Sequence, residues 1–241
     1  MEKMTDVPEN LRRKLIHEMK AGVFADCKRL PRETALSEML GISRTQLRDV
    51  LSSLEQEGYI TRKIGVGTII NHHVFKVKNR MDIETEFLDI IRNNGYEAGV
   101  ECVTATEEKA DVEIAQKLQL PEGTVIMRVT RICTANGKPA LYCEDVFAKE
   151  FIQREYTLRD LEPPIFVFLK KFCDKEAYMD LTQIHAAIAD ARLAAVLQIE
   201  EGVPIMNMEE TDYDLEGNVI FCSKQYFIDE LFEQTVMRKK L

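Results

Sequence analysis

The sequence lacks any apolar run long enough to cross a membrane and any segment typical of an export signal. A membrane-spanning helix needs roughly 20 consecutive apolar residues, and the 241-residue chain has no such stretch. Residues 1–20 are too charged for a signal peptide. The six cysteines are scattered without a C-x-x-C pair, which indicates neither a zinc knuckle nor a dense disulfide framework. We therefore expect a cytoplasmic protein with no membrane contact and with reduced, mostly buried thiols.

The sequence also lacks an arrangement of residues typical of catalysis. It contains neither a P-loop nor a G-x-G-x-x-G motif. Acidic pairs such as Glu209–Glu210 are adjacent in sequence, so their side chains point apart on a strand or a helix. His72 and His73 have no cysteine or carboxylate at metal-ligand spacing. These absences predict a protein that is not an enzyme, with no metal site and no cofactor.

What the chain does have is an uneven distribution of charge. Its formal net charge is −9, but residues 1–78 hold 14 Lys and Arg against 10 Asp and Glu. Residues 79–241 hold 18 against 31. Because affinity for phosphates depends on local charge, a basic N-terminal part is compatible with nucleic-acid binding. The length of the chain also predicts a second domain beyond this part.

The first third of the chain carries the pattern of two helices followed by a hairpin. Apolar residues recur at helical spacing over residues 34–40 and again over 44–57, after a first helix near the N-terminus. Ser43 is suited to cap the second of these helices. Two short strands, 59–63 and 68–71, follow with glycines between them. This order predicts a winged helix-turn-helix, in which the N-terminal end of the second helix meets base edges.

The segment LPRETALSEMLGISRTQLRDVLSSLEQEGYITRKIGVGT resembles the DNA-binding head of GntR-type bacterial regulators. The resemblance implies contacts with double-stranded operator DNA from Arg32, Ser43, Arg44, Thr45, Gln46, Arg48, Gly65, Gly67 and Thr68. Two positions depart from the family pattern, because Thr34 and Val66 stand where arginines are usual. We expect Arg32, Arg62 and Lys63 to compensate, with a base preference that differs from the family consensus.

The second part of the chain contains an internal repeat. The sequence LQLPEG, followed by VIM, begins at Leu118 and recurs as LQIEEG, followed by PIM, from Leu197. Each copy follows a predicted helix and precedes two strands joined by a turn. The expected helices are 82–94, 110–118, 164–172 and 187–197, and the expected strands are 125–134, 140–147, 205–213 and 219–227. This pattern predicts an α+β domain in which one antiparallel sheet carries helices on one face.

The repeat region resembles the UTRA effector domain of the HutC-type branch of GntR regulators, which shares its fold with chorismate lyase. The two halves that carry the resemblance are IAQKLQLPEGTVIMRVTRICTANGKPALYCEDVF and AAVLQIEEGVPIMNMEETDYDLEGNVIFCSKQYF. The combined resemblance implies a winged helix-turn-helix domain at 1–71, a linker at 72–81 and an effector-binding and dimerisation domain at 82–241.

The resemblance also implies an effector site. UTRA domains that hold phosphosugars use an R-x-R motif, of which Arg131 remains, while Pro164 replaces a serine at the start of the middle helix. The implied site consists of Arg131, Cys133, Cys143, Phe166, Phe221 and Cys222. Because a phosphate needs several charge-assisted donors, we expect instead an apolar effector with one polar end held by Arg131. In the alternative, the thiols sense an electrophile, an oxidant or a soft metal.

Together these features predict a homodimeric transcriptional regulator, acting as a repressor, whose DNA affinity is controlled by a small-molecule effector. Two heads would bind a roughly palindromic operator with half-sites about one helical turn apart. The alternative is a lyase-like enzyme, or a small-molecule binding protein, fused to a DNA-binding head.

Overall fold

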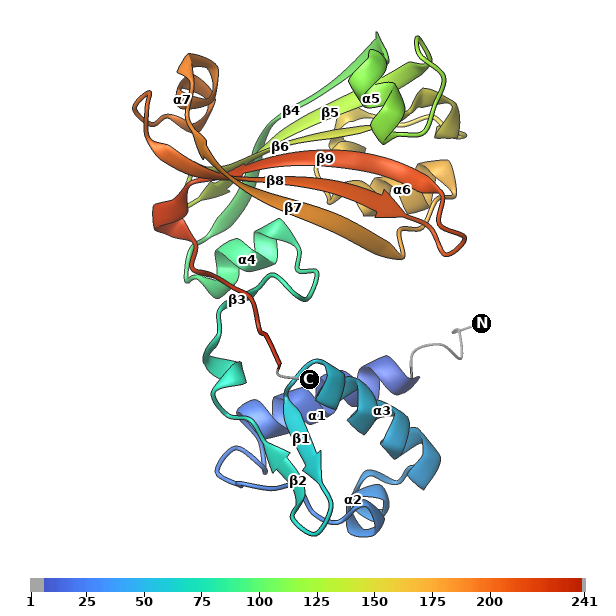
Figure 1. The fold of residues 1–241 in the computed structure, drawn as a ribbon, viewed down its shortest axis with the longest axis vertical. Coiled ribbons are helices and arrows are strands. Elements are labelled where there is room, and N and C mark those ends of the chain that lie inside the picture. Colours follow the sequence, from blue (N-terminus) through green and yellow to red (C-terminus); the bar gives the residue numbers. More distant parts are fainter. Residues whose placement is uncertain (1–6, 240–241) are drawn as a thin grey trace. The chain divides into compact units, whose positions relative to one another are not determined.

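The chain forms two compact units (Figure 1), which we call the head unit and the sheet unit. The computed structural model describes residues 7–239, with the side chains of Val7 and Cys102 left aside. The head unit comprises the chain up to Glu84 together with the segment from Gln234 onward, and the sheet unit spans Thr85–Glu233. The sequence assigned the C-terminal segment to the second domain, whereas its contacts place it in the head unit. No helix within the described residues has the length and apolar character of a membrane span.

The head unit is a three-helix bundle with a hairpin, as the sequence predicted. Its core is formed by leucines from all three helices and closed by isoleucines of the hairpin. Arg29 forms an isolated β-bridge with Ile69, so the segment before α2 lies against the hairpin. The elements are α1 (Val7–Lys20), α2 (Glu33–Leu40), α3 (Arg44–Gln56), β1 (Ile60–Lys63) and β2 (Gly67–Ile70).

The head unit is completed by a short pair of parallel strands from distant parts of the chain. After η1 (Val74–Lys76), strand β3 (Asn79–Arg80) pairs with β10 (Gln234–Thr235). Beyond β10, Lys239 donates hydrogen bonds to the carbonyl oxygens of Glu55 and, at 2.8 Å, of Gln56. These carbonyls belong to the last turn of α3, where a cation is favoured by the helix dipole. The C-terminal segment therefore caps α3.

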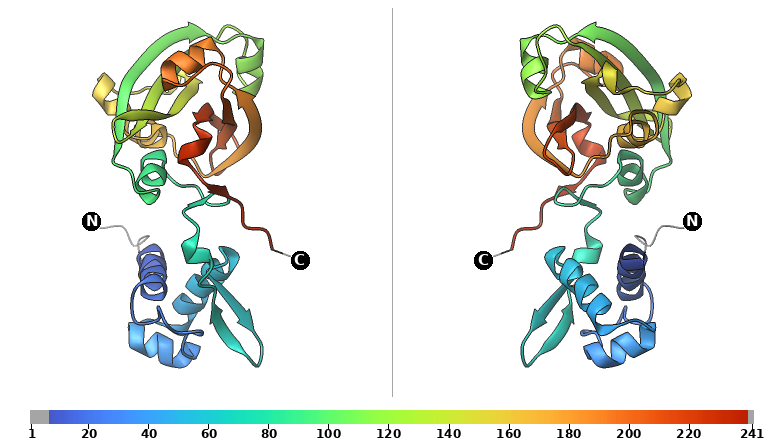
Figure 2. Two further views of the ribbon diagram at one scale, coloured as in Figure 1. Left: turned by 90° about the vertical axis from the view of Figure 1, so that its left-hand side faces the viewer. Right: turned by 90° about the vertical axis from the view of Figure 1, so that its right-hand side faces the viewer.

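The sheet unit is built on one antiparallel sheet of six strands in the order β4-β5-β6-β9-β8-β7. The four central strands are those that the internal repeat predicted. The two edge strands, β4 and β7, were not predicted. Figure 2 shows that the sheet is strongly curved. The strands are β4 (Ala98–Lys109), β5 (Val125–Ala135), β6 (Lys138–Ala148), β7 (Met179–Ile188), β8 (Pro204–Tyr213) and β9 (Val219–Phe227).

Helices cover both faces of this sheet, so the expectation of helices on one face is wrong. Helices α5 and α7 lie on one side and α4 and α6 on the other (Figure 1). Neighbouring residues of one strand show the division, because Ile126 packs with α5 while Met127 packs with α6. The helices are α4 (Phe87–Asn93), α5 (Val112–Lys117), α6 (Ile165–Cys173) and α7 (Ala191–Leu197), with short 3-10 turns at Lys149–Phe151, Leu158–Leu161 and Asp229–Leu231.

The predicted helix over 187–197 is shorter than expected for a local reason. The Asp190 side chain accepts a 2.7 Å hydrogen bond from the backbone N–H of Leu193 and so forms the N-cap of α7. The two residues before Ala189 continue strand β7 instead. The alanines of this segment favour a helix, but the cap decides where it begins.

Candidate DNA-binding surface and effector site

The N-terminal end of α3 is fixed by a reciprocal cap between Ser43 and Gln46. The Ser43 hydroxyl accepts the backbone N–H of Gln46 at 3.2 Å, and the Gln46 side-chain oxygen accepts the backbone N–H of Ser43 at 3.2 Å. This capping box confirms the predicted N-cap. It also commits the Gln46 carbonyl to the helix, which leaves its amide NH2 as the group that can face a base.

The exposed side of the same helix turn presents two arginines and a threonine. Arg44 and Thr45 are exposed. Arg48, one turn further, is also exposed, but its Nε donates to a carboxylate oxygen of Glu33 on α2 at 2.7 Å. The structure therefore brings the predicted residues of α3 together on one surface. Arg48 differs from Arg44 in that it has an intramolecular partner to leave before it can bind DNA.

The hairpin of β1 and β2 projects from the head unit as a wing (Figure 2). Gly65 and Gly67 have φ values of +78° and +99°, in the region that favours glycine, and so permit the tight turn. Lys63 is exposed, and the side chain of Ile64 at the tip is fully exposed. The wing thus presents a cation and an apolar side chain just before Val66, the position at which the family pattern has an arginine.

Arg62, which we expected to compensate for the missing wing arginine, has hydrogen-bond partners within the head unit. Its Nε donates to Glu55 at 2.7 Å and its Nη2 donates to the Ser52 hydroxyl at 3.0 Å. Both partners lie on α3, so Arg62 ties the wing to that helix, and its side chain is 32% exposed. The reason is the strand alternation, because Arg62 and Lys63 are adjacent and their side chains leave β1 on opposite sides.

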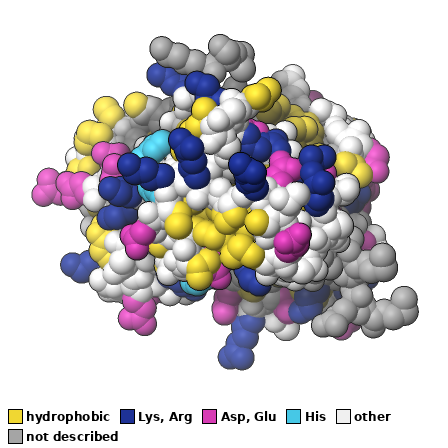
Figure 3. Space-filling view, turned by 90° about the horizontal axis from the view of Figure 1, so that it is seen from below, with side chains coloured by type: hydrophobic (Ala, Val, Ile, Leu, Met, Phe, Trp, Pro, Cys, Tyr) yellow, Lys and Arg dark blue, Asp and Glu magenta, His cyan; other side chains and the backbone are white. Residues whose placement is uncertain are grey.

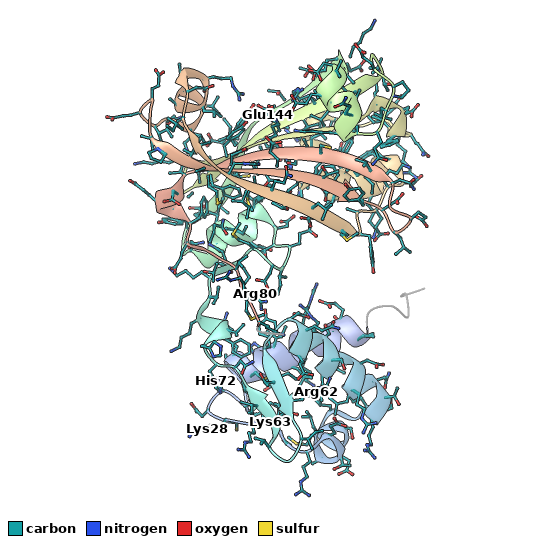
Figure 4. All side chains as sticks on the ribbon, in the orientation of Figure 1. Lys28, Arg62, Lys63, His72, Arg80 and Glu144 are labelled. Carbon is teal, nitrogen blue, oxygen red and sulfur yellow. The ribbon has the colours of Figure 1, made fainter. Side chains whose placement is uncertain are left out.

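The remaining predicted contacts lie around this surface. Arg32 is exposed at the residue before α2, and the backbone carbonyl of Thr68 accepts the N–H of Leu30 at 2.9 Å. Lys28 and Lys63 lie in the wing region of the head unit (Figure 4). Figure 3 shows this end of the head unit, where a row of lysine and arginine side chains runs along one side of a hydrophobic area. Such a surface combines phosphate-binding cations with groups that can contact bases.

The sheet unit contains a buried chain of polar side chains on the face that carries α4 and α6. Arg131 on β5 donates to Asp145 on β6 at 2.6 Å and to the carbonyl of Pro163 at 2.7 Å. The Ser223 hydroxyl on β9 donates to the other oxygen of Asp145 at 2.8 Å. Gln225, also on β9, donates from its amide nitrogen to Ser223 at 3.1 Å and to Glu210 on β8. We call these five side chains the polar chain.

Two atoms of the polar chain are buried without a hydrogen-bond partner among the described residues. They are the Nε of Arg131 and the side-chain oxygen of Gln225, and the two residues are 4% and 1% exposed. Burial alone would lower the pKa of Arg131, but the Asp145 carboxylate outweighs it and raises that pKa above the ordinary value. Arg131 is therefore charged, and its charge is already paired with a buried carboxylate.

Two of the predicted thiols lie beside Arg131. Cys133 and Cys143 are buried, and the hydrogen bond between them lowers the pKa of Cys133 and raises that of Cys143. Phe221 is buried on the same face of the sheet, and Phe166 is half-buried on α6. The structure thus brings Arg131, Cys133, Cys143 and Phe221 to one face of the sheet.

Cys222 does not belong to this group. It packs with the residues under α5 on the opposite face, and it lines a cavity of about 240 Å³ together with charged residues such as Lys117, Lys224 and Glu209. Its neighbours on β9, Phe221 and Ser223, face α6 and the polar chain, so alternation along the strand turns Cys222 away. Burial raises the pKa of its thiol.

The sequence patterns did not point to Asp145, Ser223 and Gln225, which the structure connects to Arg131 in the polar chain. The signal that could have found them is the strand pairing, since Arg131 lies opposite Cys143, which lies opposite Gln225. In an antiparallel sheet all side chains of such a row point to the same face. The row shows that odd-numbered residues of β6 and β9 share the face of Arg131.

A winged helix-turn-helix head joined to a separate α+β unit defines a DNA-binding transcriptional regulator with a sensory domain. Comparison with known families agrees. Residues 8–70 match the GntR family of bacterial regulatory proteins, and residues 93–233 match the UTRA domain. The chain therefore belongs to the GntR regulators that carry a UTRA effector domain.

Relatives of the chain include named repressors. The histidine utilization repressor of Pseudomonas putida is 26% identical over 201 residues, which cover 80% of this chain and 76% of that protein. The HTH-type transcriptional repressor NagR of Bacillus subtilis is 22% identical over 210 residues, which cover 87% of this chain and 85% of that protein. The possible transcriptional regulator YydK of B. subtilis has the same fold, with a TM-score of 0.79, 17% identity and coverage of 96% and 99% of the two chains.

Proposed function

We propose that this protein is a homodimeric repressor that binds a palindromic operator and changes its DNA affinity when a small molecule occupies the sheet unit. The observation that carries the proposal is the exposed N-terminal turn of α3, where Arg44, Thr45 and Arg48 stand on a capped helix. An arginine in this place can pair with guanine through two hydrogen bonds. The repressor role is supported by the names of the two relatives above.

The operator can be found by selecting bound duplexes from a random library with the full-length protein, followed by sequencing. The proposal predicts an inverted repeat with half-sites about one helical turn apart, bound by two protomers. Arg44→Ala serves as the matched control and should fail to enrich the same motif. Enrichment of no motif, or of a single half-site bound by one protomer, would contradict the proposal.

The homodimer is supported by the free edge of β7. Among the residues that the structure describes, strand β7 pairs with β8 on one side only. Its exposed apolar side chains are Met179, Leu181, Ile184 and Ile188, which are 53%, 61%, 50% and 69% exposed. An open edge with apolar side chains is prone to pair with another chain, and a second copy is the partner that a two-fold symmetric operator requires.

Sedimentation velocity tests this interface directly. Ile184→Glu should convert a dimer to a monomer at micromolar concentration, because it places a charge in the apolar contact. Thr106→Glu, on the other edge strand β4, is the matched control and should remain dimeric. A dimer that survives Ile184→Glu would place the interface elsewhere.

Effector control is proposed to act through the face of the sheet that holds the polar chain. A ligand shifts a conformational equilibrium only by its difference in affinity for the two states. Buried groups without partners supply such a difference, because a ligand that satisfies them favours the state in which they are accessible. Screening metabolites by thermal shift and then testing operator release identifies the effector. The alternative, a lyase-like enzyme fused to a DNA-binding head, predicts turnover of a bound metabolite in the same screen.

A further inference from the structure

The polar chain defines the chemistry of its ligand more narrowly than the position of Arg131 alone. Every oxygen of Asp145 and every amide hydrogen of Gln225 has a partner within the chain. Within the polar chain, the two atoms without a hydrogen-bond partner among the described residues are a donor, Nε of Arg131, and an acceptor, the side-chain oxygen of Gln225. Because leaving a buried polar atom without a hydrogen bond is unfavourable, both are groups that a ligand can satisfy.

The two atoms belong to one row of the sheet. Arg131 lies opposite Cys143, and Cys143 lies opposite Gln225, so the row crosses from β5 over β6 to β9. Two strand spacings separate the Cα atoms of the outer residues by roughly 10 Å. The buried Cys143 side chain lies between them and offers a small, weakly polar surface. A ligand placed over this row meets a donor at one end and an acceptor at the other.

The charge around the row argues against an anion. Arg131 is the cation of the polar chain, and Asp145 neutralises it at 2.6 Å. Glu210 adds a carboxylate at the other end of the chain. The carboxylate of Glu86, at the start of α4, also lies close enough to raise the pKa of Cys133, against the effect of Arg131. An anionic ligand would meet an arginine that Asp145 has already neutralised and a carboxylate at the other end of the row, and repulsion is strong where water is excluded.

We propose that the effector is a neutral molecule that carries both a hydrogen-bond acceptor for Arg131 and a hydrogen-bond donor for Gln225, as an amide does. This inference rests on the proposed function, since it takes this face of the sheet unit to be the effector site. It replaces the expectation of a single polar end, because the structure shows an unpaired acceptor as well as an unpaired donor. It also separates this site from one that holds a phosphate.

Three small aromatic probes of similar size test the proposal. Benzamide offers an acceptor and a donor, benzoate offers acceptors and a negative charge, and benzamidine offers donors and a positive charge. The full-length protein is labelled with ¹³C at its methionine methyl groups. Met208 lies opposite Gln225 and reports on the site, whereas Met19 is buried in the head unit and serves as the internal control. The Met208 signal is assigned with Met208→Leu.

Benzamide is expected to shift the Met208 signal with an affinity at least tenfold greater than that of benzoate or benzamidine, while Met19 stays unchanged. Two variants sharpen the result. Asp145→Asn removes the charge that neutralises Arg131 and should strengthen benzoate binding at least tenfold. Gln225→Met removes the acceptor while keeping the length of the side chain, and should abolish the preference for benzamide over benzoate.

Three outcomes would overturn the proposal. They are equal or tighter binding of benzoate by the unchanged protein, a preference for benzamide that survives in Gln225→Met, and no Met208 shift with any probe up to its solubility limit. Operator selection is run in parallel on the same protein. If selection fails but benzamide is preferred, the proposed function falls and the ligand class stands. If an operator is found but benzoate is preferred, the proposed function stands and the ligand class is wrong.

Discussion

Arg44 and Arg48 offer a sharp test of how the head reads DNA, because the structure gives them different starting states. Arg44 is exposed with no ion pair among the described residues, whereas Arg48 is held by Glu33 at 2.7 Å. We expect Arg44→Ala to weaken operator binding by about 1–3 kcal/mol, as loss of a base contact does. That corresponds to roughly 5- to 150-fold in Kd.

Arg48 must first give up its partner. The side chains of Arg48 and Glu33 are 58% and 30% exposed, and ion pairs of this kind contribute only about 0.2–1 kcal/mol. Arg48→Ala should therefore cost less than Arg44→Ala by up to that amount. Glu33→Gln removes the competing partner and should strengthen operator binding by up to about fivefold.

The gain from Glu33→Gln has two possible origins, which a double-mutant cycle separates. If the gain comes from releasing Arg48, it disappears when Arg48→Ala is also present. If it comes only from less repulsion of phosphates, it persists there, and Glu38→Gln, an exposed carboxylate on the same helix, produces a similar gain.

Fluorescence anisotropy with labelled operator and random duplexes at one fixed salt concentration measures all of these variants. The assignment of Arg44 to a base is wrong if Arg44→Ala weakens binding to both duplexes by the same factor. In that case Arg44 contacts a phosphate. The inference that Glu33 competes with DNA for Arg48 is wrong if Glu33→Gln and Glu38→Gln change the operator Kd by the same factor.

Three further predictions concern the wing and the head unit. Gly67→Val should weaken operator binding, because φ of +99° is unfavourable for a β-branched residue, and an unchanged Kd would remove the wing from DNA binding. Lys239→Ala should destabilise the head by about 0.3–1 kcal/mol, seen as faster amide hydrogen exchange in α3, and no change would mean that the cap is unimportant. Burial would raise the pKa of Glu57, but hydrogen bonds from Arg12 and Ser53 lower it. The ionised Glu57 carboxylate therefore stabilises the head above the ordinary carboxylate pKa, and this stabilisation is lost as the pH falls through the lowered value. The difference in Tm between the unchanged protein and Glu57→Gln should accordingly shrink from about pH 6 to about pH 3.

The parts of the fold that the sequence predicted are those where a local pattern decides the structure. Helix α3 has apolar residues at helical spacing that are all buried, namely Leu47, Val50, Leu51 and Leu54. This pattern predicted the bounds of α3 to within one residue. The central strands followed from the internal repeat. Strand β7 could not be predicted in the same way, because its apolar residues, such as Leu181 and Ile184, leave opposite faces of the strand and most of its side chains are exposed. Without a buried face there is no alternation to detect.

The site was predicted only in part, for a different reason. Arg131, Cys133 and Cys143 were found by resemblance, but their partners Asp145 and Gln225 depend on how strands pair across the sheet. Cys222 was also placed with Arg131 by resemblance, but a shift of one residue along a strand exchanges the two faces of the sheet, and Cys222 lies on the face opposite Arg131. The register is set by packing between distant segments and is not visible in either segment alone.

The capping of α3 by the C-terminal segment makes the head unit discontinuous in sequence, with the sheet unit as an insertion. A fragment that stops at residue 84 would lack β10, Lys239 and Met237. The Met237 side chain packs so closely on Gly58 that a Cβ at that glycine would lie 2.4 Å from it. A self-contained head should therefore be made by joining residues 7–84 to residues 234–239 through a short linker. For the same reason, a substitution within residues 234–239 can disturb the recognition helix although it lies far from that helix in the sequence.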